Sequence, residues 1–213
     1  MKLIGTGVLG GLVALAAVAL LGATSASATT LCKAKEEVCA AGNRYPAGTA
    51  VKATAVGTAK FPSSIGTVEC KESSAEGKSN EESTGSPETA LDVLVKFSFT
   101  SCLLGKTACT VEVPRAWLIL FLFLSLFPFF HVKIDRDPSL EGNANIHMKC
   151  GFLINCTYGA ENILLEGESG APASLVANEA ELAIEAGFCP EKMKWSAKYE
   201  VTAPNPLWVA PEP

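Results

Sequence analysis

The chain has 213 residues, of which 48% are hydrophobic and 18% are charged, and its formal net charge is -5 at pH 7. Its 17 basic residues against 22 acidic ones exclude a nucleic-acid-binding protein, because such a protein needs a basic surface to neutralise phosphates. The acidic excess also disfavours adhesion of the chain as a whole to anionic membranes.

Residues 1–28 have the features of a bacterial signal peptide. Lys2 precedes an apolar stretch from Val8 to Leu21, and Ala26-Ser27-Ala28 forms a small-x-small motif that a signal peptidase recognises. We therefore predict cleavage after Ala28 and secretion of the mature chain into an extracellular, oxidising environment. A transmembrane anchor is the alternative, but the apolar stretch is short and no basic flank follows it.

The next part of the chain contains one ambiguous segment, two short strands and a predicted loop. Cys32–Ala41 is rich in helix formers, and it is where we expect a single short helix pinned by a disulfide. Ala50–Val56 and Thr67–Cys70 are predicted strands. Residues 71–90 are mostly acidic and small and lack large apolar side chains until the end, so we expect a flexible, solvated loop.

Alternation of apolar and polar side chains predicts most of the remaining strands. In chain order these strands are Leu91–Thr100, Ala108–Val113, Ile146–Cys150, Phe152–Tyr158, Asn162–Glu166, Leu175–Ala186 and Met193–Thr202. The segment Leu175–Ala186 also has a helical composition, but its apolar residues oppose its glutamates with the period of a strand. Residues 204–213 are rich in proline and predicted to form an extended tail, so that residues 29–203 make one domain.

The segment Trp117–Phe130 is apolar except for Ser125. As a helix it would span about 21 Å, which is short of the ~30 Å hydrocarbon core of a bilayer. In extended form its leucines alternate with larger apolar residues, which predicts a strand or hairpin that is apolar on both faces. We favour a central core strand; the alternatives are an interaction or membrane-contacting patch and an error or drift in the coding sequence.

Three parts of the sequence contain candidate metal-binding or catalytic side chains. Residues 135–145 place oxygen-bearing side chains at every second position, as a calcium loop does, but Leu140 and Ile146 stand where an EF-hand needs glycine and glutamate. His147 is predicted on the polar face of its strand, and His131 begins another strand-like stretch. The sequence contains no G-x-S-x-G or comparable nucleophile motif. We therefore expect no catalytic, cofactor-binding or metal-binding residue.

All eight cysteines follow the signal peptide, and an even number in an exported chain predicts disulfides. The short spacings suggest three bridges, and the two remaining cysteines then form a fourth: Cys32–Cys39, Cys102–Cys109, Cys150–Cys156 and Cys70–Cys189. Eight cysteines allow on the order of 100 connectivities, so this pairing is a hypothesis based on proximity. The spacings fit neither a zinc site nor a C-x-x-C redox motif.

The order of several cysteine-containing segments resembles a family of small exported proteins from Gram-positive soil bacteria. These segments are LCKAKEEVCAAGNRYPAGT, a V-x-C strand, FSFTSCLLGKTACTV, KCGFLINCTYGA and FCPEKMKWSAKYEVTAPNPLWV. The resemblance covers most of Leu31 to Val209, and it implies no activity because the family has none assigned. Trp117–Phe130 departs from the pattern, since a more polar, alternating strand pair is expected there.

Together these features predict an all-β, disulfide-stabilised domain of the β-sandwich or jelly-roll type with at most one short helix. We expect a secreted, non-enzymatic binding or structural module of the extracellular space or cell envelope, with no cofactor and with a protein or envelope partner. One alternative is a membrane-active protein that uses Trp117–Phe130. The other is an extracellular hydrolase with an unrecognised site.

Overall fold

The computed structural model describes residues 29–79, 91–113, 116–121, 129–136, 145–159 and 163–211. The predicted signal peptide with its cleavage site after Ala28 lies outside these ranges, and so do residues 80–90 of the predicted loop. Residues 137–144, the greater part of the acidic segment 135–145, also lie outside them.

The described chain consists mainly of β-strands, which confirms the predicted all-β class. In chain order they are β1 (Thr29–Cys32), β2 (Ala50–Ala55), β3 (Ala59–Ser63), β4 (Gly66–Ser79), β5 (Leu91–Leu104), β6 (Thr107–Glu112), β7 (Ala116–Phe121), β8 (Phe129–Arg136), β9 (Ile146–Cys150), β10 (Ile154–Gly159), β11 (Ile163–Glu168), β12 (Ser174–Ala186), β13 (Lys192–Ala203) and β14 (Trp208–Pro211). In place of the predicted helix at Cys32–Ala41 the chain forms a loop, followed by one turn of 3-10 helix, η1 (Ala41–Asn43). In the described ranges no helix has the length and apolar character needed to span a bilayer.

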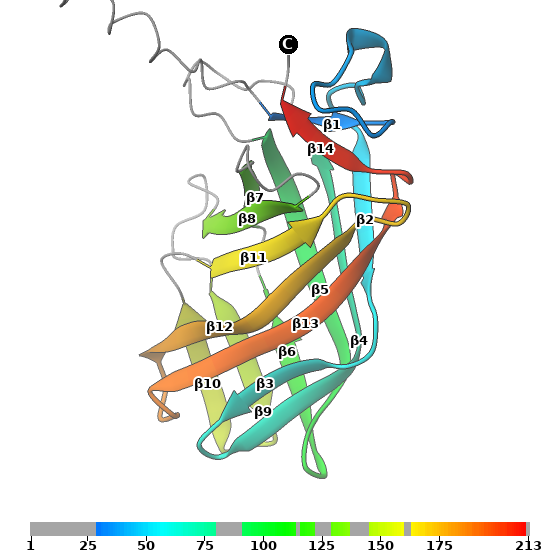
Figure 1. The fold of residues 1–213 in the computed structure, drawn as a ribbon. Helices are drawn as coiled ribbons and strands as arrows, with labels where there is room; N and C mark the ends of the chain where they lie inside the picture. Colours follow the sequence, from blue (N-terminus) through cyan, green and yellow to red (C-terminus); the bar gives the residue numbers. More distant parts are fainter. Residues whose placement is uncertain are drawn as a thin grey trace, which may run out of the picture.

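The strands close into a barrel (Figure 1). Four long strands, β4, β5, β12 and β13, run along it, and shorter strands complete the wall in two halves. In one half the described strands form the antiparallel ring β5-β7-β8-β11-β12-β13-β2-β4, and β4 pairs again with β5. In the other half they form the ring β5-β6-β9-β10-β12-β13-β3-β4, which closes through the same pair.

This closure corrects the predicted sandwich or jelly roll. A sandwich stacks two sheets that keep free edges, whereas the closing pairings β4–β5, β10–β12 and β13–β3 leave these two rings without one. Alternation along a strand shows which face is buried, but it is the same in both architectures. The two-stranded sheet β1–β14 lies apart from the barrel wall, at the upper end in Figure 1.

Aromatic side chains fill the inside of the barrel. Phe97 on β5 meets Trp195 on β13 edge to face with 5.5 Å between ring centroids, although these two strands are not neighbours. Phe61 and Phe99 make a similar contact at 5.3 Å, and Tyr199 is fully buried beside Phe97. The buried faces predicted for Leu91–Thr100 and Met193–Thr202 are thus confirmed for the side chains that are described.

Bulges allow the long strands to curve around this core. Phe99 and Cys102 are both buried although they are three residues apart, because Thr100 and Ser101 both point outward and Ser101 has a φ of 53°. In β12 the register shifts between Ala177 and Ala180. An extra residue of this kind increases strand twist and resets which side chains face inward.

The predicted loop at residues 71–90 is wrong in its first part, because residues 71–79 belong to β4. β4 pairs with β2 on one side and with β5 on the other over this stretch. Its buried residues there are small, among them Ser73 and Ala75, and they make room for the large aromatic side chains opposite. The Ser73 and Tyr199 hydroxyl oxygens lie 2.7 Å apart in a buried hydrogen bond. The lack of large apolar residues therefore led to the prediction of a loop where the chain forms a strand.

The predicted tail at residues 204–213 is also corrected. Trp208–Pro211 forms β14, which pairs antiparallel with β1 from Thr29↔Pro211 to Cys32↔Trp208. The Tyr45 hydroxyl donates a hydrogen bond of 2.6 Å to the Pro206 carbonyl oxygen and holds the connection in place. The domain therefore extends past residue 203, and the two ends of the described chain are joined.

The apolar segment Trp117–Phe130 contributes to two strands of the wall. β7 pairs with β8 from Ala116↔Arg136 to Phe121↔His131, which confirms the predicted strand or hairpin for the residues that are described. In the ring β5-β7-β8-β11-β12-β13-β2-β4, this pair lies between β5 and β11. Residues 122–128 lie outside the described chain.

Four disulfides join all the cysteines, which indicates an oxidising compartment. Cys32–Cys39 is paired as predicted, whereas the other three bridges are Cys70–Cys102, Cys109–Cys150 and Cys156–Cys189. The predictions Cys102–Cys109, Cys150–Cys156 and Cys70–Cys189 are therefore wrong. Cys70, Cys102, Cys109 and Cys150 lie in one row across β4, β5, β6 and β9, so each inner cysteine has two cross-strand neighbours. Sequence spacing does not distinguish between those neighbours.

Candidate functional site

The histidines and the acidic turn do not assemble into a site within the described residues. His147 lies on β9, and its Nε2 atom is 2.8 Å from Asn155 Oδ1 on β10, in a polar pair on the outer surface. His131 lies in β8, which neighbours neither β9 nor β10 in the sheet. No metal site is expected in the acidic segment 135–145, and this stays a prediction because most of the segment lies outside the described chain.

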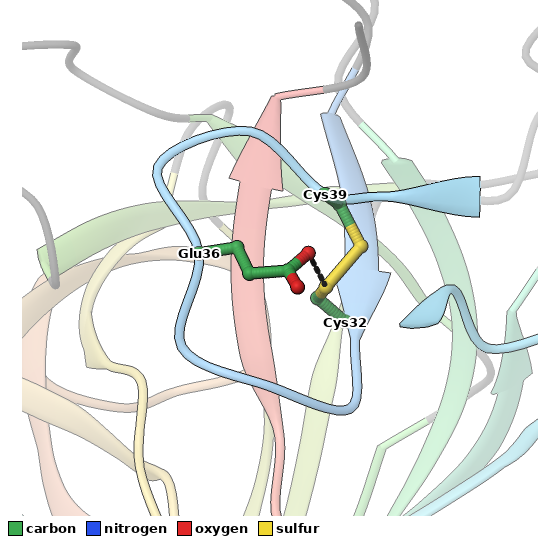
Figure 2. Close-up of side chains that lie close together, drawn as sticks. All are labelled: Cys32, Glu36 and Cys39. Atoms are coloured by element: carbon green, nitrogen blue, oxygen red, sulfur yellow. Dashed lines mark hydrogen bonds between the residues drawn. A yellow bond between two sulfur atoms is a disulfide. The ribbon is translucent and has the colours of Figure 1, made fainter. Parts of the chain in front are cut away.

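A cluster of two sulfurs and one carboxylate lies in the loop after β1 (Figure 2). The Sγ atoms of Cys32 and Cys39 and a Glu36 carboxylate oxygen lie within 4.8 Å of one another, a donor set that would suit zinc if the thiolates were free. Both sulfurs are bonded to each other, so neither is a thiolate here. A disulfide sulfur also carries no proton, and the 3.7 Å approach of Cys32 Sγ to Glu36 Oε2 is therefore a packing contact.

The Glu36 carboxylate instead holds the loop together. The Ala40 N–H donates to Glu36 Oε2 at 2.7 Å, and Asn43 Nδ2 donates to Glu36 Oε1 at 2.5 Å. The ammonium of Lys35 lies 5.7 Å from the centroid of the Trp208 ring, and that ring also packs against the buried disulfide. These contacts tie the loop to the β1–β14 pair, so their role is structural.

The opposite end of the barrel has a different character. Here the ring β5-β6-β9-β10-β12-β13-β3-β4 turns back on itself in hairpins between β3 and β4, β5 and β6, β9 and β10, and β12 and β13 (Figure 1). Of the nine large hydrophobic side chains that are exposed in the described chain, five lie in or beside these turns. We call them the apolar rim: Ile65, Leu103, Phe152, Leu153 and Phe188.

The two phenylalanines of the apolar rim are exposed almost completely. The exposed fraction is 95% for Phe152 and 106% for Phe188, against 78% for Leu153. Values near 100% mean that nothing packs against the ring, so each phenylalanine protrudes from its turn. Ile65 and Leu103 are partly exposed and line a hollow of about 640 Å³ between the first two turns.

Contacts between neighbouring turns bring the residues of the apolar rim to one end of the barrel. A Cβ atom at Gly66 would lie 3.0 Å from the Leu104 side chain, which places the first turn against the second. A Cβ atom at Gly151 would lie 3.2 Å from the Thr107 methyl group, so the second turn meets the third. Gly187 lies against the backbone of Asn155 in the same way. The four turns are thus neighbours around one end of the barrel.

Disulfides anchor the turns that carry the phenylalanines. Cys150 directly precedes the turn of Phe152 and is bonded to Cys109 on β6. Cys189 directly follows Phe188 and is bonded to Cys156 on β10. Rigid turns lose little conformational entropy when they bind, which favours their use as contact points.

Lysines predominate around the apolar rim. The four turns and the four strand residues on either side of each contain five lysines and three glutamates: Lys60, Lys106, Lys149, Lys192 and Lys194 against Glu69, Glu185 and Glu191. All of these side chains are exposed. Three of these lysines are in ion pairs, Lys60 with Glu69, Lys192 with Glu181 and Lys194 with Glu179. Lys106 and Lys149 form no ion pair within the described residues, so they are the cations that this end of the barrel presents.

The apolar rim was not predicted from the sequence. Phe152 was predicted in a strand, whereas residues 151–153 form the turn between β9 and β10. A local signal was present, because Gly151-Phe152 and Gly187-Phe188 each put a large apolar residue directly after a glycine and within two residues of a cysteine. In comparisons with known proteins, no family model, curated protein or solved structure matches this chain.

Proposed function

We propose that this protein is an exported, non-enzymatic binding module that acts outside the cell or in the cell envelope and attaches to its partner through the apolar rim. The observation that carries the proposal is the concentration of exposed large apolar side chains on one end of a closed barrel. Large apolar side chains in contact with water are unfavourable, and proteins that gather several of them on one face generally use that face for contact.

The remaining structure supports a scaffold for that surface. The interior is packed with aromatic side chains, and the disulfides hold the walls and turns together. The turns project outward from this body, so the feature that the chain presents to its surroundings is a recognition surface. Export is supported by the predicted signal peptide at residues 1–28 and by the disulfides.

A sedimentation assay tests the proposal. The mature, oxidised protein is mixed with a cell-envelope fraction from a Gram-positive bacterium, and the bound fraction is compared with that of Phe152→Ser/Phe188→Ser. We expect the wild-type protein to sediment with the envelope and the rim variant to remain in solution. The matched control is Val56→Ser/Leu164→Ser, which removes two side chains exposed by 51% and 57% elsewhere on the surface.

The control should bind as the wild-type protein does. Equal binding by the rim variant, or no binding by the wild-type protein, would overturn the proposal. A urea unfolding curve for each variant shows that lost binding is not lost folding, since replacing fully exposed side chains leaves the core intact.

A further inference from the structure

The shape and charge of the apolar rim identify a class of partner. Resting on the proposed function, we propose that the rim docks on the surface of a lipid bilayer, with Phe152, Leu153 and Phe188 inserted among the headgroups. The protein would be bound peripherally, with its body in water.

The first argument is shape. The apolar rim is a crown of separate, protruding side chains on neighbouring turns, and the phenylalanines are exposed by 95% and 106%. A protein partner would need a matching pocket for each tip. A bilayer interface is deformable and accepts several apolar tips at once, with binding strength that rises with the apolar area inserted.

The second argument is the position of the lysines. Lys106 lies in the turn between β5 and β6, and Lys149 lies two residues before Gly151. Neither forms an ion pair within the described residues, whereas Lys192, which follows the turn of Phe188, pairs with Glu181. A lysine placed behind an apolar tip extends its ammonium group to the phosphate layer while its methylene chain lies on apolar surface. The apolar side chains at the tips of the turns would therefore reach the acyl-chain boundary, and the lysines behind them would reach the phosphate layer.

The same charge argues against a second copy of this chain as the partner. Two rims that met end to end would bring Lys106 and Lys149 of both copies together, and like charges in contact oppose association. A phospholipid surface supplies phosphate groups of the opposite sign. The acidic balance of the whole chain does not remove this attraction, because charges beyond about 10 Å are largely screened in physiological salt.

The proposed surface is distinct from the membrane contact that the sequence suggested at Trp117–Phe130. β7 and β8, which contain the described part of that segment, belong to the other half of the barrel. The turns of the apolar rim connect strands of the half that contains β3, β6, β9 and β10.

Vesicle binding tests the inference. Mature, oxidised protein is sedimented with vesicles of phosphatidylcholine alone and with vesicles of equal parts phosphatidylcholine and phosphatidylglycerol. We expect binding to both, several-fold tighter to the anionic vesicles. Phe152→Ser/Phe188→Ser should lower the partition coefficient for both by at least about tenfold, because inserting one phenylalanine is worth on the order of tenfold. Val56→Ser/Leu164→Ser should leave it unchanged.

Charge reversal separates the two contributions. Lys106→Glu/Lys149→Glu should remove the preference for anionic vesicles and leave the binding to phosphatidylcholine within about twofold of wild type. Direct insertion is read from Phe188→Trp, whose emission should be quenched by phospholipid with brominated acyl chains. The emission of Leu164→Trp on the wall should not be quenched.

The outcomes distinguish this inference from the function on which it rests. Rim-dependent binding to the envelope fraction without binding to either vesicle would overturn the lipid assignment and leave the binding module in place, with a protein or wall polymer as its partner. Vesicle binding that is equal for the rim variant, or an unquenched Phe188→Trp, would also overturn the lipid assignment. Loss of both envelope and vesicle binding by the wild-type protein would overturn both proposals.

Discussion

Removing the Cys109–Cys150 bridge should destabilise the protein more than removing the Cys32–Cys39 bridge. The two bridges close loops with sequence separations of 41 and 7 residues. The entropy that a bridge removes from the unfolded chain grows with the logarithm of the loop length. On that basis Cys109→Ala/Cys150→Ala should lower the free energy of unfolding by about 4 kcal/mol, and Cys32→Ala/Cys39→Ala by about 2.5 kcal/mol.

Urea unfolding of the oxidised proteins measures the difference. The shift in midpoint is multiplied by the slope of the transition for each variant, since removing a crosslink also enlarges the unfolded chain and raises that slope. An equal or larger loss for Cys32→Ala/Cys39→Ala would refute the loop-length argument.

The single variant Cys109→Ala tests the pairing itself. The structure pairs Cys109 with Cys150, so alkylation under native conditions followed by peptide mapping should find the free thiol at Cys150. A free thiol at Cys102 would instead restore the pairing suggested by sequence spacing. The two outcomes are distinct because Cys102 lies opposite Cys109 on the other neighbouring strand.

Three further predictions concern the core, a turn and the exported form. Burial raises the pKa of the Tyr199 phenol above its usual value near 10, so the unfolded chain loses this proton first and stability should fall as the pH rises above about 10. Tyr199→Phe should weaken that alkaline loss in urea titrations; an unchanged slope would contradict it. Gly187→Ala should lower the free energy of unfolding by about 2–3 kcal/mol, because the added methyl group would clash with the Asn155 carbonyl oxygen. The φ of 101° at Gly187 is also unfavourable for alanine. Gly57→Ala, at a φ of 84° in open space, should cost about 1 kcal/mol in the same unfolding assay. Mass spectrometry of the secreted chain should find cleavage after Ala28, and an intact N-terminus would refute the signal peptide.

Local sequence patterns were sufficient to predict a strand where its apolar and polar side chains alternate regularly. The alternation in Met193–Thr202 predicted β13 and its buried face, because a strand with one face on a core has the same period wherever that core lies. The opposed glutamates in Leu175–Ala186 predicted β12 in spite of its helical composition. Cys32 and Cys39 were paired as predicted, because they lie in β1 and the loop after it, apart from the row of cysteines on β4, β5, β6 and β9.

Residues that depend on distant partners were not predictable in this way. Residues 71–79 have the composition of a solvated loop. They are held in β4 by hydrogen-bond ladders to β2 and β5 and by the buried hydrogen bond between Ser73 and Tyr199. Trp208–Pro211 resembles a tail, yet it pairs with the strand at the start of the described chain. In both places the hydrogen-bonding partner is remote, so the local sequence does not contain the information.

The sequence by itself determined the β class, the oxidised cysteines and the faces of the regular strands, because these follow from side-chain period and from the even number of cysteines. Tertiary structure alone decided that the sheet closes, which cross-strand cysteine is bonded to which, and that four turns far apart in the chain meet at one end. The apolar rim exists only through that closure. Each turn contributes one or two exposed apolar side chains, and the pairing of distant strands brings them together as a single surface.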